Sequence, residues 1–352
     1  MGRSGGDFRY GSADIHRGQR VTHLTSGITA GHREGPRVGS EPEVPAVDDE
    51  EMALGVAVSV AQSGEAGEDA LRAVALPLAQ MPGGPEVGTF VHRVLETVDF
   101  ASEDLASELA TAVEVQRRWR SIDVGPSATL VAGLQAAIAT PLGALVGDRA
   151  LGDIARVDRV DELWFELPLV GGDNAGTASL QIGGIGDALR RHIRPGDPLH
   201  GYADLLGDPA LRRELRGYLA GSLDLVFRAD AGADTRFAVV DYKTNWLGLG
   251  GEELTAWHYQ PDALTAAMHR AHYPLQALFY CVALHRYLRW RLPGYSAGRN
   301  LAGALYLFVR GMVGPDTPVV DGQRCGVFSW PAVPALVEEL SDLFDRGAEA
   351  VA

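Results

Sequence analysis

Apolar residues after position 85 recur at two different spacings, which predicts a domain that mixes helices with strands. Apolar positions 91, 94, 95 and 98 have helical spacing, so a helix is expected from Gly88 onward, with Thr89 as its N-cap. The same reasoning predicts further helices at about 101–120 and 127–139, from about 261, at Pro274–Arg291 and at Ala332–Phe344. Residues 184–217 are expected to be helical or irregular.

Short apolar runs bounded by turn residues predict strands at 163–169, 221–228, 237–245 and 301–309. A Gly-rich loop at 171–176 follows the first of them. The second and third are separated by the polar stretch 230–234, which predicts a turn and therefore an antiparallel pair. Such a pair would bring Asp224 and Asp241 toward a common site, although the pattern alone does not determine the register.

The first 85 residues have a different composition, in which Gly, Pro, Ser and charged residues dominate up to Glu51. An acidic run at 48–51 and the scarcity of apolar periodicity predict a poorly ordered leader or linker with one short helix at 68–79. The functional domain is therefore expected at 86–352.

Composition excludes several classes of protein. With 31 Lys and Arg against 46 Asp and Glu, the net charge of −15 argues against coating nucleic acid by bulk charge, but it permits one local DNA groove. No run of 18 uncharged apolar residues exists, so no membrane span is expected. The two cysteines, Cys281 and Cys325, are too few for a disulfide framework or an iron–sulfur cluster, and a reducing cytoplasm is the expected compartment.

Lys243 is the only lysine of the chain, whereas arginine occurs 30 times. This single position excludes a phosphate-cradling G-x-x-x-x-G-K-[ST] loop, so no ATP site is expected. Lysine is a compact point charge whose pKa changes readily, which suits work beside a reacting water better than the guanidinium of arginine does. The alternative is an ordinary solvated lysine at the end of a strand.

Asp224 lies among apolar residues of a predicted strand, where a charge is costly unless it is paired or bound to metal. Asp241 stands two residues before Lys243 at the end of the next strand. Two carboxylates with a nearby amine suit metal-assisted hydrolysis of a phosphodiester, because carboxylate oxygens are ligands that Mg²⁺ prefers. An equally simple interpretation is a partly buried ion pair between Asp224 and Lys243 without catalytic use.

Five sequence blocks resemble, in the same order, the C-terminal nuclease domain of RecB, the beta subunit of the RecBCD helicase–nuclease (exodeoxyribonuclease V), within the PD-(D/E)XK nuclease superfamily. The blocks are Gly88-Thr89-Phe90-Val91-His92 with Leu95-Glu96 and Asp99-Phe100, then Gly221 to Arg228, Asp241-Tyr242-Lys243-Thr244-Asn245-Trp246-Leu247-Gly248, Gln276-x-x-x-Tyr280 with Ala283 to Leu288, and Tyr306 to Gly311. The similarity runs from about 86 to 345.

The resemblance implies an α/β, restriction-endonuclease-like PD-(D/E)XK core, in which helices flank a central mixed β-sheet and the N-terminal part is helical. His92, Asp224 and Asp241 would ligate one or two Mg²⁺ ions together with the backbone carbonyl of Tyr242. Lys243 would be catalytic. Gln276 and Tyr280 would line the site and help to position Lys243 or the DNA. The family also has an acid before the first Asp strand, for which Glu162 and Glu166 both qualify.

The implied function is hydrolysis of DNA single strands from an unwound duplex, within an exodeoxyribonuclease V complex of double-strand break repair and recombination. Partners would be RecC- and RecD-like subunits and a helicase part that this sequence lacks, so a C-terminal piece of a longer protein is expected. The alternatives are a non-catalytic nuclease-like module that binds DNA or subunits, and an inactive fragment. Arg190, Arg191 and Arg194, with the later arginines at 212, 213 and 216, form either a phosphate-binding patch or solvated helix faces.

Overall fold

The computed structural model describes residues 21–23, 65–170, 180–208, 214–215, 217–230 and 235–346. Most of the expected leader, the Gly-rich loop at 171–176, most of the turn at 230–234 and the arginines at 212, 213 and 216 lie outside these residues. Within the described residues, no helix is long and apolar enough to cross a lipid bilayer.

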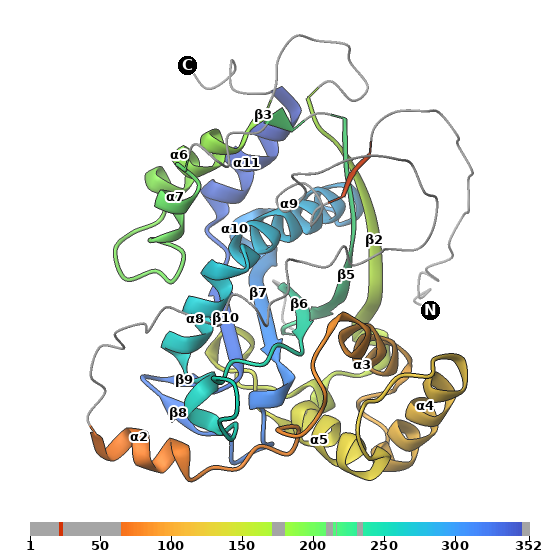
Figure 1. Cartoon of the computed structure of the whole chain (residues 1–352). Coiled ribbons are helices and arrows are strands. Elements are labelled where there is room, and N and C mark those ends of the chain that lie inside the picture. Colours follow the sequence, from red (N-terminus) through yellow and green to blue (C-terminus); the bar gives the residue numbers. More distant parts are fainter. Residues whose placement is uncertain are drawn as a thin grey trace, which may run out of the picture.

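A mixed six-stranded sheet forms the centre of the molecule (Figure 1). Its order is β1 (Val21–His23), β5 (Tyr218–Arg228), β6 (Phe237–Lys243), β7 (Leu301–Phe308) and β10 (Val327–Pro331), and β2 (Arg159–Pro168) pairs with β5 as well. The β5–β6 pair is antiparallel, which confirms the predicted hairpin, and its register places Leu225 opposite Val240. The β6–β7 pair is parallel, and β1 is parallel to β5. The prediction of a mixed sheet is therefore confirmed.

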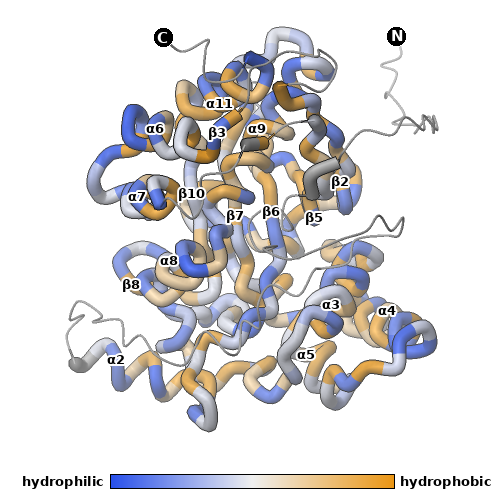
Figure 2. The backbone as a smooth tube through the Cα atoms, turned by 45° about the horizontal axis from the view of Figure 1, so that its top comes forward, coloured by the Kyte–Doolittle hydropathy of each residue, from blue (hydrophilic) through white to orange (hydrophobic). Residues whose placement is uncertain are grey.

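Helices cover both faces of this sheet and create two hydrophobic cores. The first core lies against α6 (Ile182–His192), α8 (Pro261–Arg270), α9 (Tyr273–Arg291) and α11 (Pro334–Arg346). The second lies against α3 (Pro85–Thr97), α4 (Leu105–Trp119) and α5 (Ser127–Ala139). Hydrophobic residues gather along the central strands and on the helix sides that face them (Figure 2).

The remaining elements are short. They are helices α2 (Glu65–Arg72), α7 (Tyr202–Leu205) and α10 (Ala297–Asn300), the 3₁₀ turns η1 (Ala144–Val146), η2 (Leu151–Asp153), η3 (Arg156–Asp158), η5 (Ala256–Tyr259) and η6 (Val309–Gly311), and the strand pairs β3 (Leu180–Gln181) with β4 (Glu214–Leu215) and β8 (Val319–Val320) with β9 (Gln323–Arg324).

Strand alternation distributes the residues of β6 between the two cores. Val239 packs into the first core, whereas Val240 and Tyr242 pack into the second. Because successive side chains point to opposite faces, Asp241 and Lys243 lie on the α9 side of the sheet and Tyr242 on the α3 side. The sheet therefore presents neighbouring residues of one strand to two different sets of helices.

The alternation breaks where β2 passes β5. Leu223 belongs to the first core and Leu225 to the second, although residues two apart on a regular strand share a face. The register pairs Asp161 with Leu225 and Leu163 with Leu223, and it skips Glu162 and Asp224 between them. Glu162 has a φ of 50°, in the left-handed region that non-glycine residues seldom adopt. This local distortion lies at the candidate site, where strained backbone often occurs.

Several details differ from the sequence-based expectation. The first helix of the domain begins at Pro85 rather than Gly88, because proline is well suited to the first helical position. Thr89 is therefore not its N-cap, and its hydroxyl donates to the Pro85 carbonyl inside the helix. The region 184–217 is not only helical or irregular, since β4 pairs with β3. The short strand β10 was not predicted.

Arg310 ties the segment before α3 to the end of β6. Its guanidinium is fully buried and donates to the Thr244 carbonyl at 2.7 Å and to the Leu78 carbonyl at 3.0 Å. It also donates to the carbonyls of Met81 and Pro82. Residues 78–82 thus pack against the domain, although they precede residue 86, where the sequence predicted the domain to begin.

Replacing Arg310 by alanine is expected to lower the free energy of unfolding by about 3–5 kcal/mol, because buried carbonyls lose their donors. Urea denaturation measures this loss. Arg299→Ala is the matched control, since exposed Arg299 also donates to a carbonyl, that of Gly294, and its removal is expected to cost less than about 0.5 kcal/mol. Equal losses in the two variants would contradict a structural role for Arg310.

Candidate active site

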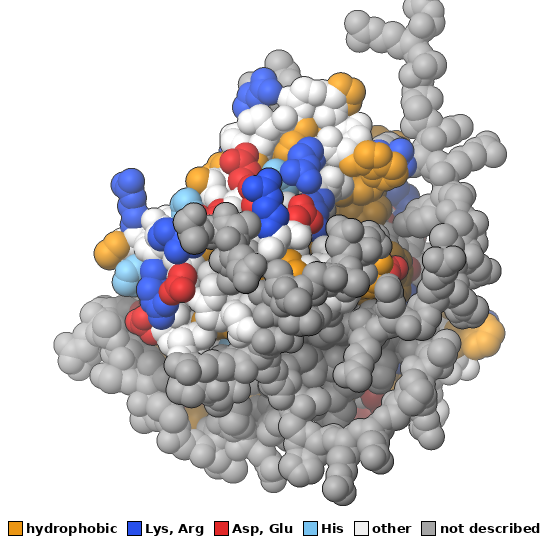
Figure 3. Space-filling model, turned by 90° about the horizontal axis from the view of Figure 1, so that it is seen from above, with side chains coloured by type: hydrophobic (Ala, Val, Ile, Leu, Met, Phe, Trp, Pro, Cys, Tyr) orange, Lys and Arg blue, Asp and Glu red, His pale blue; other side chains and the backbone are white. Residues whose placement is uncertain are grey.

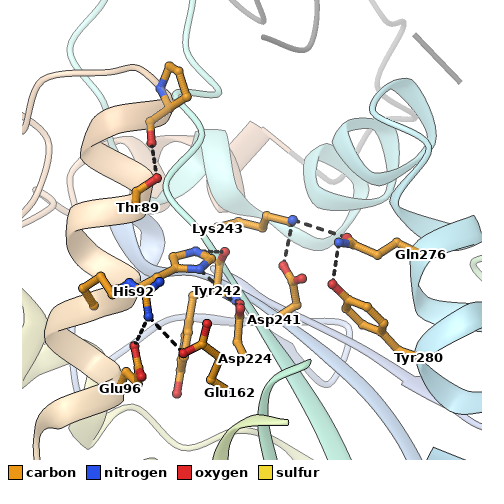
Figure 4. Close-up of polar contacts among 12 residues, drawn as sticks. Thr89, His92, Glu96, Glu162, Asp224, Asp241, Tyr242, Lys243, Gln276 and Tyr280 are labelled. Carbon is orange, nitrogen blue, oxygen red and sulfur yellow. Dashed lines mark hydrogen bonds and ion pairs between the residues drawn. The ribbon is translucent and has the colours of Figure 1, made fainter. Parts of the chain in front are cut away.

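Helix α3 brings His92 to the junction between β5 and β6 (Figure 4). The helix packs closely there, because a Cβ on Gly88 would lie 3.3 Å from the Thr244 hydroxyl oxygen. His92 Nε2 lies 2.8 Å from the Tyr242 carbonyl oxygen, and His92 Nδ1 lies 3.3 Å from Asp224 Oδ1. The other carboxylate oxygen, Asp224 Oδ2, accepts the backbone N–H of Tyr242 at 2.9 Å.

These contacts require His92 to carry both ring protons. A carbonyl oxygen can only accept, so Nε2 donates to Tyr242, and an unprotonated Nδ1 would face the Asp224 carboxylate with its lone pair. Although burial alone lowers the pKa of His92, the charge and hydrogen bond of Asp224 raise it to about 9. Burial alone raises the pKa of Asp224, but His92 and the Tyr242 N–H together lower it below its ordinary value.

Asp241 and Lys243 form a second ion pair close to the first, with 2.7 Å between Oδ2 and Nζ. Only 3% of the Asp241 side chain and 13% of the Lys243 side chain are exposed. Burial raises the pKa of Asp241 to about 6, and the nearby Asp224 charge adds to this effect. For Lys243, burial favours a lower pKa, but Asp241 outweighs it and raises the pKa, so the amine is protonated.

Two tyrosine rings and an amide complete the surroundings of the Lys243 ammonium. Nζ lies 3.9 Å from the centre of the Tyr273 ring and 5.5 Å from that of Tyr306, within the range of cation–π attraction. Nζ also donates to Gln276 Oε1 at 3.4 Å, and Gln276 Nε2 donates to the Tyr280 hydroxyl at 2.8 Å. Residues 273, 276 and 280 share one face of α9 because they are three and four positions apart.

The structure separates the two acids proposed before the first Asp strand. Glu162 lies beside the cluster and accepts from Arg93 Nη1 at 2.9 Å, and the same nitrogen lies 2.8 Å from Glu96. Burial and a hydrogen bond with Glu96 raise the pKa of Glu162. Glu166, in contrast, is exposed. Of the two, Glu162 is placed to assist the site.

The expected metal ligands are adjacent but do not form a metal cage. Among the residues that the structure describes, no group of three or more His, Cys, Asp or Glu side chains is arranged so that it could hold a metal ion. His92 and Asp224 instead pair with each other, and Asp241 pairs with Lys243. The donor set of two carboxylates, one carbonyl and one imidazole nevertheless suits a hard divalent cation. Both cysteines are buried and free.

All six side chains named from the sequence come together in two neighbouring sub-clusters: His92 with Asp224, and Asp241 with Lys243, Gln276 and Tyr280 (Figure 4). The alternative interpretation, an ion pair between Asp224 and Lys243, is wrong in its acid, because Lys243 pairs with Asp241. Sequence reasoning missed Tyr273 and Tyr306 as neighbours of Lys243. Tyr273 lies three residues before Gln276 on the predicted helix, which is the signal that was available for it.

The arginines of α6 lie among acids rather than in an uninterrupted basic patch. Arg190 pairs with Asp187, and Arg191 and His192 both contact Glu339 of α11. Basic and acidic side chains are correspondingly mixed on the described part of the face in Figure 3. These pairs favour the interpretation of solvated helix faces for Arg190 and Arg191.

A family model and individual relatives both assign the chain to the same protein family. Residues 68–350 match the model of the PD-(D/E)XK nuclease superfamily. The chain is 44% identical over 322 residues to the RecBCD enzyme subunit RecB of Mycolicibacterium smegmatis, a match that covers 91% of this chain and 28% of that protein. It is 32% identical over 237 residues to RecB of Escherichia coli K12, covering 66% of this chain and 17% of that protein. The chain thus spans 28% of the length of its mycobacterial relative.

The Asp241–Lys243 pair is expected to be energetically coupled, because both groups are buried and each is the charge partner of the other. A double-mutant cycle with Asp241→Asn and Lys243→Met, followed by urea denaturation in EDTA, is expected to give a coupling energy of about 2 kcal/mol. The control cycle uses Arg190 and Asp187, an exposed helical pair with an expected coupling of about 0.3 kcal/mol. Coupling no larger than that of the control pair would contradict the buried ion pair.

Proposed function

Because the chain belongs to the PD-(D/E)XK nuclease superfamily, we propose that the cluster around Asp241 and Lys243 hydrolyses phosphodiester bonds of DNA with the help of Mg²⁺. The observation that carries this proposal is the meeting of Asp224 and Asp241, from adjacent strands, with the only lysine of the chain. Two acids beside an amine suit hydrolysis at a phosphate, where negative charge develops that an amine can stabilise.

The metal would be held by Asp224, Asp241 and the Tyr242 carbonyl, with His92 as a nitrogen ligand and one or two ions in the site. The bound metal would supply an activated water and neutralise charge on the phosphate. His92 would first have to lose a proton and release the Tyr242 carbonyl, because both of its ring nitrogens now face acceptor oxygens as donors and neither offers a lone pair to a cation. Metal binding and deprotonation of His92 are therefore expected to be linked.

Lys243 would orient the attacking water and stabilise the negative charge that develops on the phosphate oxygens. Its ammonium is already held by Asp241, by Gln276 and by the face of Tyr273. Of the two polar contacts, the hydrogen bond to Gln276 is the longer, at 3.4 Å against 2.7 Å for the ion pair with Asp241. The amide of Gln276 would therefore yield most readily when Lys243 turns toward a bound phosphate. Tyr280 would support that amide from its other end.

The relatives carry the name of a subunit of the RecBCD enzyme, which supports a place in repair of double-strand breaks and in recombination. The substrate would be single-stranded DNA, cleaved as an exodeoxyribonuclease V does. RecC- and RecD-like subunits and a helicase would supply that strand from duplex DNA in the cytoplasm. The competing function is a nuclease-like module that binds DNA or partner subunits without cleaving, and the intact Asp224, Asp241 and Lys243 favour the catalytic alternative.

Lys243→Gln and Asp241→Ala are expected to lower Mg²⁺-dependent cleavage of a labelled single-stranded oligonucleotide roughly a thousandfold or more, because the first removes the charge that would stabilise the reacting phosphate and the second removes a metal ligand. Product formation on a denaturing gel measures this loss. Arg299→Ala is the control and is expected to cleave as the wild type does. Circular dichroism confirms that each variant is folded.

A second arm separates catalysis from binding. The Lys243→Gln variant is expected to retain affinity for the oligonucleotide in fluorescence anisotropy, since Lys243 would be one contact among several between the protein and the DNA. A wild type that binds the oligonucleotide but cleaves no more than this variant at any Mg²⁺ concentration would instead establish the binding module.

A further inference from the structure

The amide of Gln276 has two chemically different ends, and its orientation decides what Lys243 meets. The carbonyl oxygen Oε1 accepts from Lys243 Nζ, while Nε2 donates to the Tyr280 hydroxyl. If the amide were rotated by half a turn, an NH₂ group would face the ammonium and the two donors would repel each other. Tyr280 alone does not prevent this rotation, because a hydroxyl can donate as well as accept.

A third group, Tyr306 on β7, contacts the same amide. Its hydroxyl lies 3.1 Å from Gln276 Oε1 and 3.2 Å from the Tyr273 carbonyl oxygen. The Tyr306 side chain is fully buried, and this burial raises its pKa well above the ordinary value, so the hydroxyl keeps its proton. The hydroxyl has one proton to donate, and the Tyr273 carbonyl and Gln276 Oε1 are both within reach of it. When the proton goes to Oε1, it stabilises the amide orientation in which that oxygen also faces Lys243.

Tyr306 is tied to the site in two further ways. In the parallel β6–β7 pair it is the register partner of Asp241, so it is placed by the same ladder that places the acid. Its ring stacks on Tyr273 with 5.9 Å between centroids and 21° between planes. The Tyr273 ring in turn lies under the Lys243 ammonium. One residue thus contacts both the amide and the ring that surround the amine.

We propose that Tyr306 is a positioning residue for Lys243, whose hydroxyl bridges the Gln276 amide and the Tyr273 carbonyl and thereby holds the two groups that place the ammonium. The inference rests on the proposed nuclease function, because positioning matters only if Lys243 takes part in a reaction. It adds a residue that would hold neither the phosphate nor the metal. Tyr306 acts through Gln276 and Tyr273.

The test uses Tyr306→Phe, which removes the hydroxyl and keeps the ring. Tyr295→Phe is the matched control, because Tyr295 also contributes a hydroxyl to a single side-chain contact, 2.9 Å from His285 Nδ1. In Mg²⁺-dependent cleavage of a single-stranded oligonucleotide, Tyr306→Phe is expected to lower kcat roughly tenfold with KM unchanged, since a misplaced group weakens the transition state more than binding. Tyr295→Phe is expected to leave both constants unchanged.

The second readout needs no metal and no activity. Since Lys243 is the only lysine, protein labelled with ¹³C,¹⁵N-lysine shows a single lysine side chain in an NMR spectrum recorded in EDTA. A ring 3.9 Å from Nζ is expected to move the Hε signals of the wild type upfield from those of free lysine. In Tyr306→Phe these signals are expected to lose at least half of that displacement, and in Tyr295→Phe none of it.

The two readouts separate failure of this inference from failure of the proposed function. Unchanged lysine signals in folded Tyr306→Phe would overturn the inference even if the wild type cleaves DNA. Displaced signals with an unchanged kcat would also overturn it, because the hydroxyl would then place an amine whose position does not matter. If the wild type cleaves no DNA, the proposed nuclease function fails, and the lysine signals alone decide whether Tyr306 positions Lys243.

Discussion

The hydrogen bond from the Tyr242 N–H to the Asp224 carboxylate is the interaction on which the site depends. The ladder between β5 and β6 ends at Leu225 and Val240, and a buried backbone donor beyond it must find another acceptor. A side chain of β5 supplies that acceptor. The two strands therefore separate without an unpaired N–H, and the opening between them holds Asp224 and the Tyr242 carbonyl.

The two cores then determine what faces this opening. Alternation along β6 directs Asp241 and Lys243 toward α9, where an amide and two aromatic rings hold the amine. The α3 side supplies His92, whose charge balances that of Asp224. Arg310 holds the segment before α3 against Thr244, next to Lys243, so the two halves of the site are mechanically connected. Removing a positive charge from either half leaves a buried carboxylate uncompensated.

Local patterns predicted much of this arrangement. The strand that carries Asp241 and Lys243, the hairpin that joins β5 to β6 and the helix that carries Gln276 and Tyr280 all follow from short-range patterns, and each is confirmed. What failed depends on contacts between distant segments. The left-handed backbone of Glu162, the neighbourhood of Tyr306 and the choice of Asp241 as the partner of Lys243 follow from register and packing, which no local pattern encodes.

The central claim is that Asp224 and Asp241 together bind the catalytic metal, and a crystal of the protein soaked in Mn²⁺ tests it most directly. Mn²⁺ replaces Mg²⁺ at oxygen-rich sites and can be located by its anomalous scattering. The account predicts an anomalous peak in contact with carboxylate oxygens of both residues, with His92 turned away from the Tyr242 carbonyl. A fully soaked crystal in which Mn²⁺ binds only elsewhere, while His92 still pairs with Asp224, would contradict it.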